Sequence, residues 1–248
     1  MPTWLAAVWM AGVTVAAGGD APAGLQPAQV VVELFTSQGC SSCPPADALW
    51  RRFGDEPALR ARVVPPAFHV DYWNSLGWSD PFSSAAWSAR QNGYARAFAS
   101  GRIYTPQAIV DGRAECLGSD EDEVLARVEE AARRPLGQIA LRRLADGSLA
   151  VTAVAPDRAR RPLAVFVAIY EREHTTAVER GENGGRRLQN AFIVRRLEAA
   201  FTLSPAPPVE HVVPLQLDPA WQGLRLGVAV FLQDPTTREI FGGRAIDL

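Results

Sequence analysis

Two cysteines separated by two residues, Cys40 and Cys43, stand between a buried-strand pattern and a helical pattern. The strand pattern is the apolar run Val30–Phe35, and the helical pattern covers Ala46–Phe53. A helix that begins at this point brings both sulfurs within bonding distance, and the free N–H groups of its first turn stabilise a thiolate. Because the thiolate is the attacking species in disulfide exchange, we expect Cys40 to be an exposed nucleophile and Cys43 the resolving thiol.

A structural disulfide in an exported protein is the alternative interpretation of the same pair. A bridge across so short a loop constrains the unfolded chain little and therefore stabilises the fold weakly. The loop size favours redox or thiol-binding chemistry over a purely structural bridge. The intervening Ser41-Ser42 adds hydroxyl donors but no positive charge, from which we expect an intermediate reduction potential.

A threonine–proline pair, Thr105-Pro106, lies directly before a short predicted strand, Gln107–Val110. A CxxC joined to a strand–helix pattern is typical of thioredoxin-like redox pairs. In that fold a cis-proline faces the cysteines, and the residue before it offers its backbone to an extended substrate. An X-Pro bond can be cis at modest cost, so we expect a cis peptide here rather than an ordinary trans proline that opens a strand.

The chain resembles a bacterial exported family with no assigned activity, domain of unknown function 1223, in five sequence blocks. These are VVVELFTSQGCSSCPPAD, FHVDYWNSLGWSDPF, SARQNGYA, YTPQAIVDGR and RGENGGR. The resemblance covers most of residues 29–248 and implies a thioredoxin-like fold. It does not imply a demonstrated reaction.

The wider thioredoxin superfamily also places an acid in the strand that leads to the CxxC. Glu33 occupies the corresponding strand and lies seven residues before Cys40. Glu33 is therefore a candidate proton relay. An ion pair and a solvated strand end are the alternatives for this residue.

The pattern of the chain changes after Arg134-Pro135. Before this point strands alternate with helical patterns, whereas strand-like runs follow one another after it without intervening helices. We therefore expect a thioredoxin-like α/β domain over residues 29–135 and an antiparallel β-rich, sandwich-like domain over residues 136–248. The strand-like runs of the second segment are Ile139–Leu144, Leu149–Val154, Leu163–Tyr170, Phe192–Leu197, Val212–Leu217 and Leu224–Leu232.

The N-terminus carries an uncharged apolar run, Trp4–Ala17, that is too short to span a bilayer. Its length suits the core of a secretory signal peptide, although Met1–Thr3 carries no arginine or lysine. An uncleaved anchor and a wrongly chosen start codon are the alternatives. We predict a signal peptide over residues 1–19, a linker over residues 20–28, a periplasmic or secreted location and no transmembrane span in the mature chain.

Composition excludes several other classes of function. All 25 basic residues are arginine, which rules out a lysine nucleophile or Schiff base, and the net charge of -2 argues against nucleic-acid binding. Three histidines and three cysteines make a four-ligand zinc site hard to build. A serine hydrolase is poorly supported because no G-x-S-x-G motif is present.

An aromatic segment follows the second predicted strand, in which His69 and Asp71 share one face. It either forms a wall of the substrate site or packs in the core, with His69 hydrogen-bonded to Asp71. Two thiolates and an imidazole, from Cys40, Cys43 and His69, also suit Cu(I), although the close cysteine spacing and the lack of a methionine cluster count against copper. The aromatic residues are Tyr72, Trp73, Trp78, Phe82 and Trp87.

The third cysteine, Cys116, follows a hairpin signal at Asp111-Gly112. With a two-residue turn, Cys116 pairs with Gln107, next to Pro106. A lone extra cysteine is more often a small buried hydrophobe than a third redox thiol, and we expect the former.

The glycine-rich segment Arg180–Arg186 lacks the arrangement of a phosphate-binding loop. A long hairpin tip is the simplest interpretation. Our hypothesis is that it folds back against the CxxC, with Arg180 or Arg186 paired to an acid there.

These features together predict an exported thiol–disulfide oxidoreductase, or a thiol-dependent redox partner, that acts on protein or small-thiol disulfides without an organic cofactor. A non-catalytic binding module that presents an aromatic cleft is the competing hypothesis, and a Cu(I)-binding chaperone is a third. The candidate catalytic residues are Cys40, Cys43, Thr105, Pro106 and Glu33.

Overall fold

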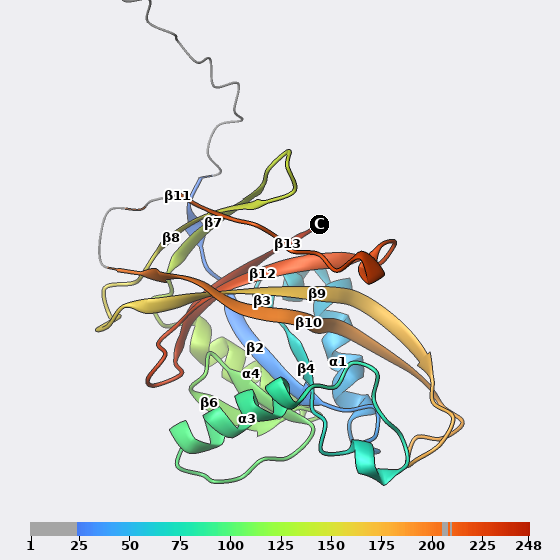
Figure 1. Ribbon diagram of the computed structural model, residues 1–248. Helices are drawn as coiled ribbons and strands as arrows, with labels where there is room; N and C mark the ends of the chain where they lie inside the picture. The colour runs from blue at the N-terminus through green and yellow to red at the C-terminus, as the bar shows by residue number, and fades with distance from the viewer. Residues whose placement is uncertain (1–23, 205–207, 209) are drawn as a thin grey trace, which may run out of the picture.

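The computed structural model describes residues 24–204, 208 and 210–248 (Figure 1). The predicted signal peptide lies outside these residues. Within them, no helix is both long enough and apolar enough to cross a bilayer. The helices are α1 (Pro44–Asp55), α2 (Pro57–Arg60), α3 (Ala85–Ala97) and α4 (Glu121–Ala132), with short 3-10 turns at Asn74–Leu76 and Pro219–Trp221.

Thirteen strands are described, and they dominate the second half of the chain. The strands of the first half are β1 (Gln26–Pro27), β2 (Val30–Thr36), β3 (Val63–Val64), β4 (Ala67–His69), β5 (Gln107–Val110) and β6 (Ala114–Leu117). Those of the second half are β7 (Gln138–Arg143), β8 (Leu149–Val154), β9 (Leu163–Ala177), β10 (Arg187–Leu203), β11 (Glu210–Val213), β12 (Leu226–Gln233) and β13 (Ile240–Asp247).

The expected thioredoxin-like α/β domain followed by a separate β-rich domain is wrong. Strands make up 39% of the structure and helices 21%, and strands from both segments form one curled nine-stranded sheet. Its order is β13-β12-β9-β10-β4-β2-β5-β6, with β3 paired to β2. The segments join where β10 runs parallel to β4, with Ile193 opposite Ala67. A pairing between strands so distant in the chain leaves no local sequence signal, which is why the segments resembled two domains.

A second sheet of four strands, in the order β1-β7-β8-β11, packs against the part of the large sheet that contains β9, β12 and β13 (Figure 1). The core between the two sheets is almost entirely aliphatic. Each such side chain contributes roughly 1.5–3 kcal/mol when it is fully buried. The fully buried members of this core include Ile139, Leu149, Val151, Leu163, Val165, Val228, Val230 and Leu232.

Helices cover both faces of the large sheet around β2. Val30, Val32 and Leu34 pack in one core with α1 and α4, whereas Val31 and Phe35 pack in another core with α3. This follows from the alternation of side chains along a strand. A strand buried on both faces has a fixed register, so the end of β2 and the cysteine loop after it are held firmly.

Glu33 lies on the α3 face of β2, where it is fully buried. Its carboxylate accepts hydrogen bonds from Arg90 Nε, at 2.6 Å, and from the Tyr94 hydroxyl. Arg90 also donates to the Gln233 side chain on β12, at 3.2 Å. These contacts match the ion-pair alternative, and neither disulfide cysteine is among the partners of Glu33. The pair links β2, α3 and β12 through the core.

Replacing Arg90 with Met should lower the free energy of unfolding by about 3–5 kcal/mol, because it leaves the Glu33 carboxylate buried without a counter-ion. Chemical denaturation followed by tryptophan fluorescence measures this loss. The double variant Glu33→Leu/Arg90→Met is the control and should recover most of the stability, since no buried charge then lacks a partner. An equal loss in the double variant would show that packing, and not charge compensation, holds this region.

Candidate functional site

A disulfide between Cys40 and Cys43 closes the loop that connects β2 to α1. The two Cα atoms are 5.5 Å apart, and Cys43 N donates to Cys40 O at 3.2 Å. Cys43 is the N-cap residue of α1, and Pro44 is the first residue of the helix. The predicted helix start is confirmed. Both sulfurs therefore lie at the N-terminal end of α1, although its first two residues, Pro44 and Pro45, carry no backbone N–H.

The cis peptide bond expected at Thr105-Pro106 is confirmed, and it lies beside the disulfide. The Thr105 carbonyl oxygen is 3.9 Å from Cys40 Sγ and accepts a hydrogen bond from Ser42 Oγ at 3.4 Å. The Thr105 hydroxyl in turn accepts from Trp73 Nε1 at 2.8 Å. The structure thus brings Cys40, Cys43, Thr105 and Pro106 together, with Trp73 as a support.

The expected exposure of Cys40 is wrong. Both cysteines are 0% exposed, whereas the two serines between them, Ser41 and Ser42, are exposed. The disulfide therefore lies directly beneath the surface rather than on it.

A hairpin tip, residues 178–186 between β9 and β10, lies against the cysteine loop. The buried Asn183 donates through Nδ2 to the carbonyls of Gln38, at 2.9 Å, and Cys40, at 3.0 Å. Glu182 accepts a hydrogen bond from the Ser41 N–H at 3.0 Å. The hairpin tip therefore folds back as expected. The hypothesis that Arg186 pairs with an acid near the CxxC is not met, because Arg186 instead donates to Asn183 Oδ1 at 2.7 Å.

A buried carboxylic acid that the sequence analysis did not identify lies behind the loop. Asp47 is on α1, one turn after Cys43, and its carboxyl accepts a hydrogen bond from Thr36 Oγ1 at 3.0 Å. Burial raises the pKa of Asp47 to about 7, and nearby His69 and the hydrogen bond from Thr36 oppose this rise only in part. The pKa of Asp47 therefore lies near neutral pH. Its side chain is on the same helix face as Cys43, since residues four apart lie on one face.

His69 forms a buried ion pair with Asp80, and not the hydrogen bond with Asp71 that one of the two interpretations of this segment gave it. Its Nδ1 is 2.7 Å from Asp80 Oδ2, which also accepts from the Gln38 N–H at 2.7 Å. Burial alone lowers the pKa of His69, but the Asp80 carboxylate and its hydrogen bond raise it overall. Burial likewise raises the pKa of Asp80, but His69 and two backbone N–H groups lower it overall. Asp71 instead bonds to Ser88.

A copper site formed by Cys40, Cys43 and His69 finds no support in this arrangement. Within residues 24–204, 208 and 210–248, no three histidine, cysteine, aspartate or glutamate side chains are grouped so as to hold a metal ion. His69 instead directs one ring nitrogen to Asp80.

Comparison with known proteins places this arrangement in a family. A family model described as "Protein of unknown function (DUF1223)" matches residues 31–233. The chain belongs to this family. The resemblance seen in the sequence blocks is therefore confirmed. A search of curated proteins gave no match.

Two solved structures are similar to this DUF1223 chain. A crystal structure of a protein from Agrobacterium tumefaciens is 30% identical, with a TM-score of 0.74, over 89% of this chain and 95% of that one. HBP35 of Porphyromonas gingivalis is 14% identical, with a TM-score of 0.56, over 90% of this chain and 76% of that one. At this low identity the second similarity concerns the fold alone.

The remaining cysteine of this DUF1223 protein, Cys116, is buried in the core beneath α1 and α4. Burial raises the pKa of its thiol to about 12, so it is unreactive at neutral pH. Its strand partner is Ala108 and not Gln107. The difference arises because three residues, 111–113, connect β5 to β6 instead of two.

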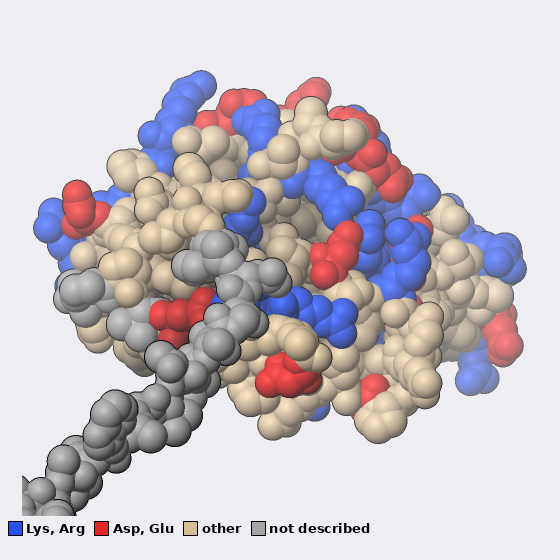
Figure 2. Space-filling view, turned by 90° about the horizontal axis from the view of Figure 1, so that it is seen from above, with Lys and Arg blue, Asp and Glu red and all other residues tan. Residues whose placement is uncertain are grey.

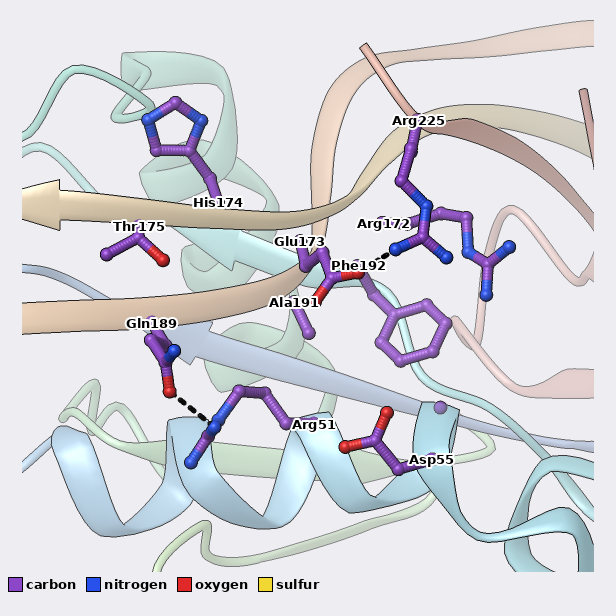
Figure 3. Close-up of a pocket in the computed structure, with 11 residues that line it drawn as sticks. Arg51, Asp55, Arg172, Glu173, His174, Thr175, Gln189, Ala191, Phe192 and Arg225 are labelled. Atoms are coloured by element: carbon purple, nitrogen blue, oxygen red, sulfur yellow. Dashed lines mark hydrogen bonds and ion pairs between the residues drawn. The ribbon is translucent and has the colours of Figure 1, made fainter.

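A pocket of about 190 Å³ lies between the second half of α1 and the β9–β10 hairpin, apart from the disulfide (Figure 3). Its arginines already have partners in the chain, since Arg51 bonds to Gln189 at 2.5 Å and Arg225 pairs with Glu173. Basic and acidic side chains are also interspersed over the face seen in Figure 2. Arg172 likewise pairs with Asp247, whereas the partner of Arg51 is a neutral amide, so the charge of Arg51 is not compensated by that contact.

Stability should depend on pH through Asp47. Between about pH 4 and 7 the folded chain binds more protons here than the unfolded chain, because the pKa rises from 3.8 to about 7 on folding. The stability associated with this group is therefore greatest at low pH and is lost as pH rises. Asp47→Asn should be more stable than wild type at pH 8, by up to about 4 kcal/mol, with the difference vanishing near pH 4.

Thermal unfolding between pH 4 and pH 8 measures this difference. The matched control is Asp55→Asn, which removes an exposed carboxyl from the same helix and should leave the difference from wild type independent of pH. A constant stability difference between Asp47→Asn and wild type across the pH range would contradict the prediction.

Proposed function

We propose that this DUF1223 protein is an exported thiol–disulfide oxidoreductase, or a thiol-dependent redox partner, that acts on protein or small-thiol disulfides through Cys40 and Cys43. The observation that carries the proposal is the disulfide at the start of α1 with the Thr105 carbonyl 3.9 Å from Cys40 Sγ. A bridge over four residues stabilises a fold weakly, so its placement at a helix end argues for chemistry.

Reduction of a substrate begins with the Cys40 thiolate, which attacks one sulfur of the substrate disulfide. A Cys40–substrate bond forms, and the other substrate sulfur leaves as a thiolate that takes a proton from water. The Cys43 thiolate then attacks the Cys40 sulfur, re-forms the Cys40–Cys43 bond and releases the second substrate thiol. A dithiol or two small thiols must return the pair to its reduced form, and the same steps run backwards oxidise a dithiol substrate.

Two features of the site favour an ionised Cys40, and a third can accept a proton from the side of Cys43. The N-terminal end of α1 supplies partial positive charge, and the Ser42 hydroxyl lies 3.3 Å from Cys40 Sγ, where it can donate to a thiolate. Asp47 supplies a buried acceptor on the side of Cys43, with a pKa of about 7. Because the sulfurs are covered in the oxidised state, a partner has to displace the neighbouring contacts before exchange occurs.

A second candidate is a non-catalytic binding module in which the disulfide is permanent. The complete burial of both cysteines favours this alternative. The exposed side chains Tyr72 and Leu76, 38% and 53% exposed, would then contribute to a contact surface near the loop. This candidate requires a disulfide that glutathione does not reduce.

Export is part of the proposal and is supported by the apolar run Trp4–Ala17. An oxidising compartment suits a protein whose disulfide is formed in the folded chain. Fractionation of the cells that produce the protein, followed by N-terminal sequencing, tests both the location and the cleavage of residues 1–19.

Cys40→Ser should abolish exchange with a disulfide substrate such as insulin, because it removes the attacking sulfur. Cys43→Ser should instead accumulate a mixed disulfide between Cys40 and the substrate, which non-reducing electrophoresis and mass spectrometry detect. Cys116→Ser is the matched control and should retain wild-type activity, since its thiol is buried in the core. Full activity of Cys40→Ser, or a native disulfide that resists glutathione, would favour the binding module.

A further inference from the structure

The hairpin tip, residues 178–186, places a carboxylate against the peptide that follows Cys40. Glu182 Oε2 accepts a hydrogen bond from the Ser41 N–H at 3.0 Å. Covalent geometry keeps the Ser41 nitrogen within about 5 Å of Cys40 Sγ, so this carboxylate oxygen lies within about 8 Å of the sulfur. The contact lowers the pKa of Glu182, so the group is an anion at neutral pH.

Glu182 is held in this position by its neighbours. Asn183 is completely buried and ties the hairpin tip to the carbonyls of Gln38 and Cys40. Gly181 packs so closely on Gly77 that a Cβ atom added to Gly77 would lie 3.2 Å from Gly181 Cα. The backbone of the hairpin tip is therefore fixed against the cysteine loop, and the exposed Glu182 side chain reaches that loop through its hydrogen bond with the Ser41 N–H.

The position of Glu182 opposes the features that favour a Cys40 thiolate. The negative charge of Glu182 repels a thiolate. Its carboxylate also accepts the hydrogen bond of the Ser41 N–H, so that this group is not free to donate to a thiolate. The groups that favour the Cys40 thiolate, and whose effect Glu182 opposes, are the positive end of α1 and the Ser42 hydroxyl. The charged groups facing the loop are Glu182 and Arg186 from the hairpin tip, Asp47 from α1, and His69 and Asp80 from β4 and the loop after it.

We infer that Glu182 restrains the acidity of the Cys40 thiol and thereby makes the cysteine pair a weaker oxidant. This inference rests on the proposed exchange chemistry for its functional meaning. In exchange with glutathione, one protein disulfide and two glutathione thiols give one protein dithiol and one glutathione disulfide. A carboxylate that disfavours the Cys40 thiolate disfavours the dithiol side of this equilibrium. Glu182 is thus a positioning residue that tunes the pair without touching the reacting sulfurs.

The test is the ionisation of Cys40 in Glu182→Gln, followed by the ultraviolet absorbance of the thiolate as pH is varied. The measurement uses the reduced full chain in a Cys43→Ser background. Cys116 does not interfere, because burial raises the pKa of its thiol to about 12. At low salt the ionisation constant of Cys40 should rise by about three- to tenfold, the effect of one partly screened charge at this distance. The increase should shrink at about 1 M salt.

The matched control is Glu179→Gln, which removes the same charge from the same hairpin tip, three residues before Glu182. It should change the ionisation constant of Cys40 by less than about twofold, because within the described residues no hydrogen bond holds the exposed Glu179 carboxylate against the cysteine loop and solvent screens its charge. An unchanged constant in Glu182→Gln, or an equal change in both variants, would overturn the inference. A wild-type disulfide that does not exchange with glutathione would overturn the proposed function instead and would leave the titration result valid.

Discussion

The parallel contact between β10 and β4 is the constraint on which the rest of the structure depends. It joins the β9–β10 hairpin, with strands of 15 and 17 residues, to the part of the sheet that ends at the disulfide. Because β4 also pairs with β2, the register Thr36–His69 and the register Ile193–Ala67 are fixed together. The hairpin tip is therefore held on the cysteine loop by the sheet as a whole, and the surroundings of the disulfide come from both halves of the chain.

Two buried ion pairs lie on opposite faces of the strands that lead to this loop. Glu33 and Arg90 are on the α3 face, whereas His69 and Asp80 are near the end of β4 on the side of Asp47. Removing ions from water is costly, and the His69–Asp80 pair carries an additional cost because His69 Nε2 is buried without a hydrogen-bond partner among the described residues. The first pair joins β2 to α3, and the second joins β4 to the loop after it, where Asp80 also accepts a hydrogen bond from the Gln38 N–H. Asp47 lies one helical turn after Cys43, whereas the Glu33 carboxylate is paired with Arg90 on the α3 face.

The sequence was sufficient to predict the local elements of the site, but not the contacts that close over it. The CxxC between an apolar strand and a helix, and the proline at Thr105-Pro106, are local patterns with local physical causes. Asp47 could have been noticed as an acid among the buried helix residues Ala46, Leu49, Trp50 and Phe53. The continuous sheet and the Asp80 partner of His69 depend on distant pairings, and one additional turn residue shifted the partner of Cys116.

The buried disulfide is compatible with the proposed exchange chemistry when a partner can open the contacts that cover the two sulfurs. Hydrogen bonds from Asn183 and to Glu182 cover a loop whose two middle residues are exposed. Each such bond contributes a net stability of only about 0.5–1.5 kcal/mol, or about 1.5–3 kcal/mol when one partner is charged. A protein partner that supplies equivalent donors and acceptors can replace these bonds, whereas a small thiol such as glutathione reacts only when they break and therefore exchanges more slowly. Under the proposed function, the cover would therefore slow non-specific exchange while leaving the pair reachable for a matching surface.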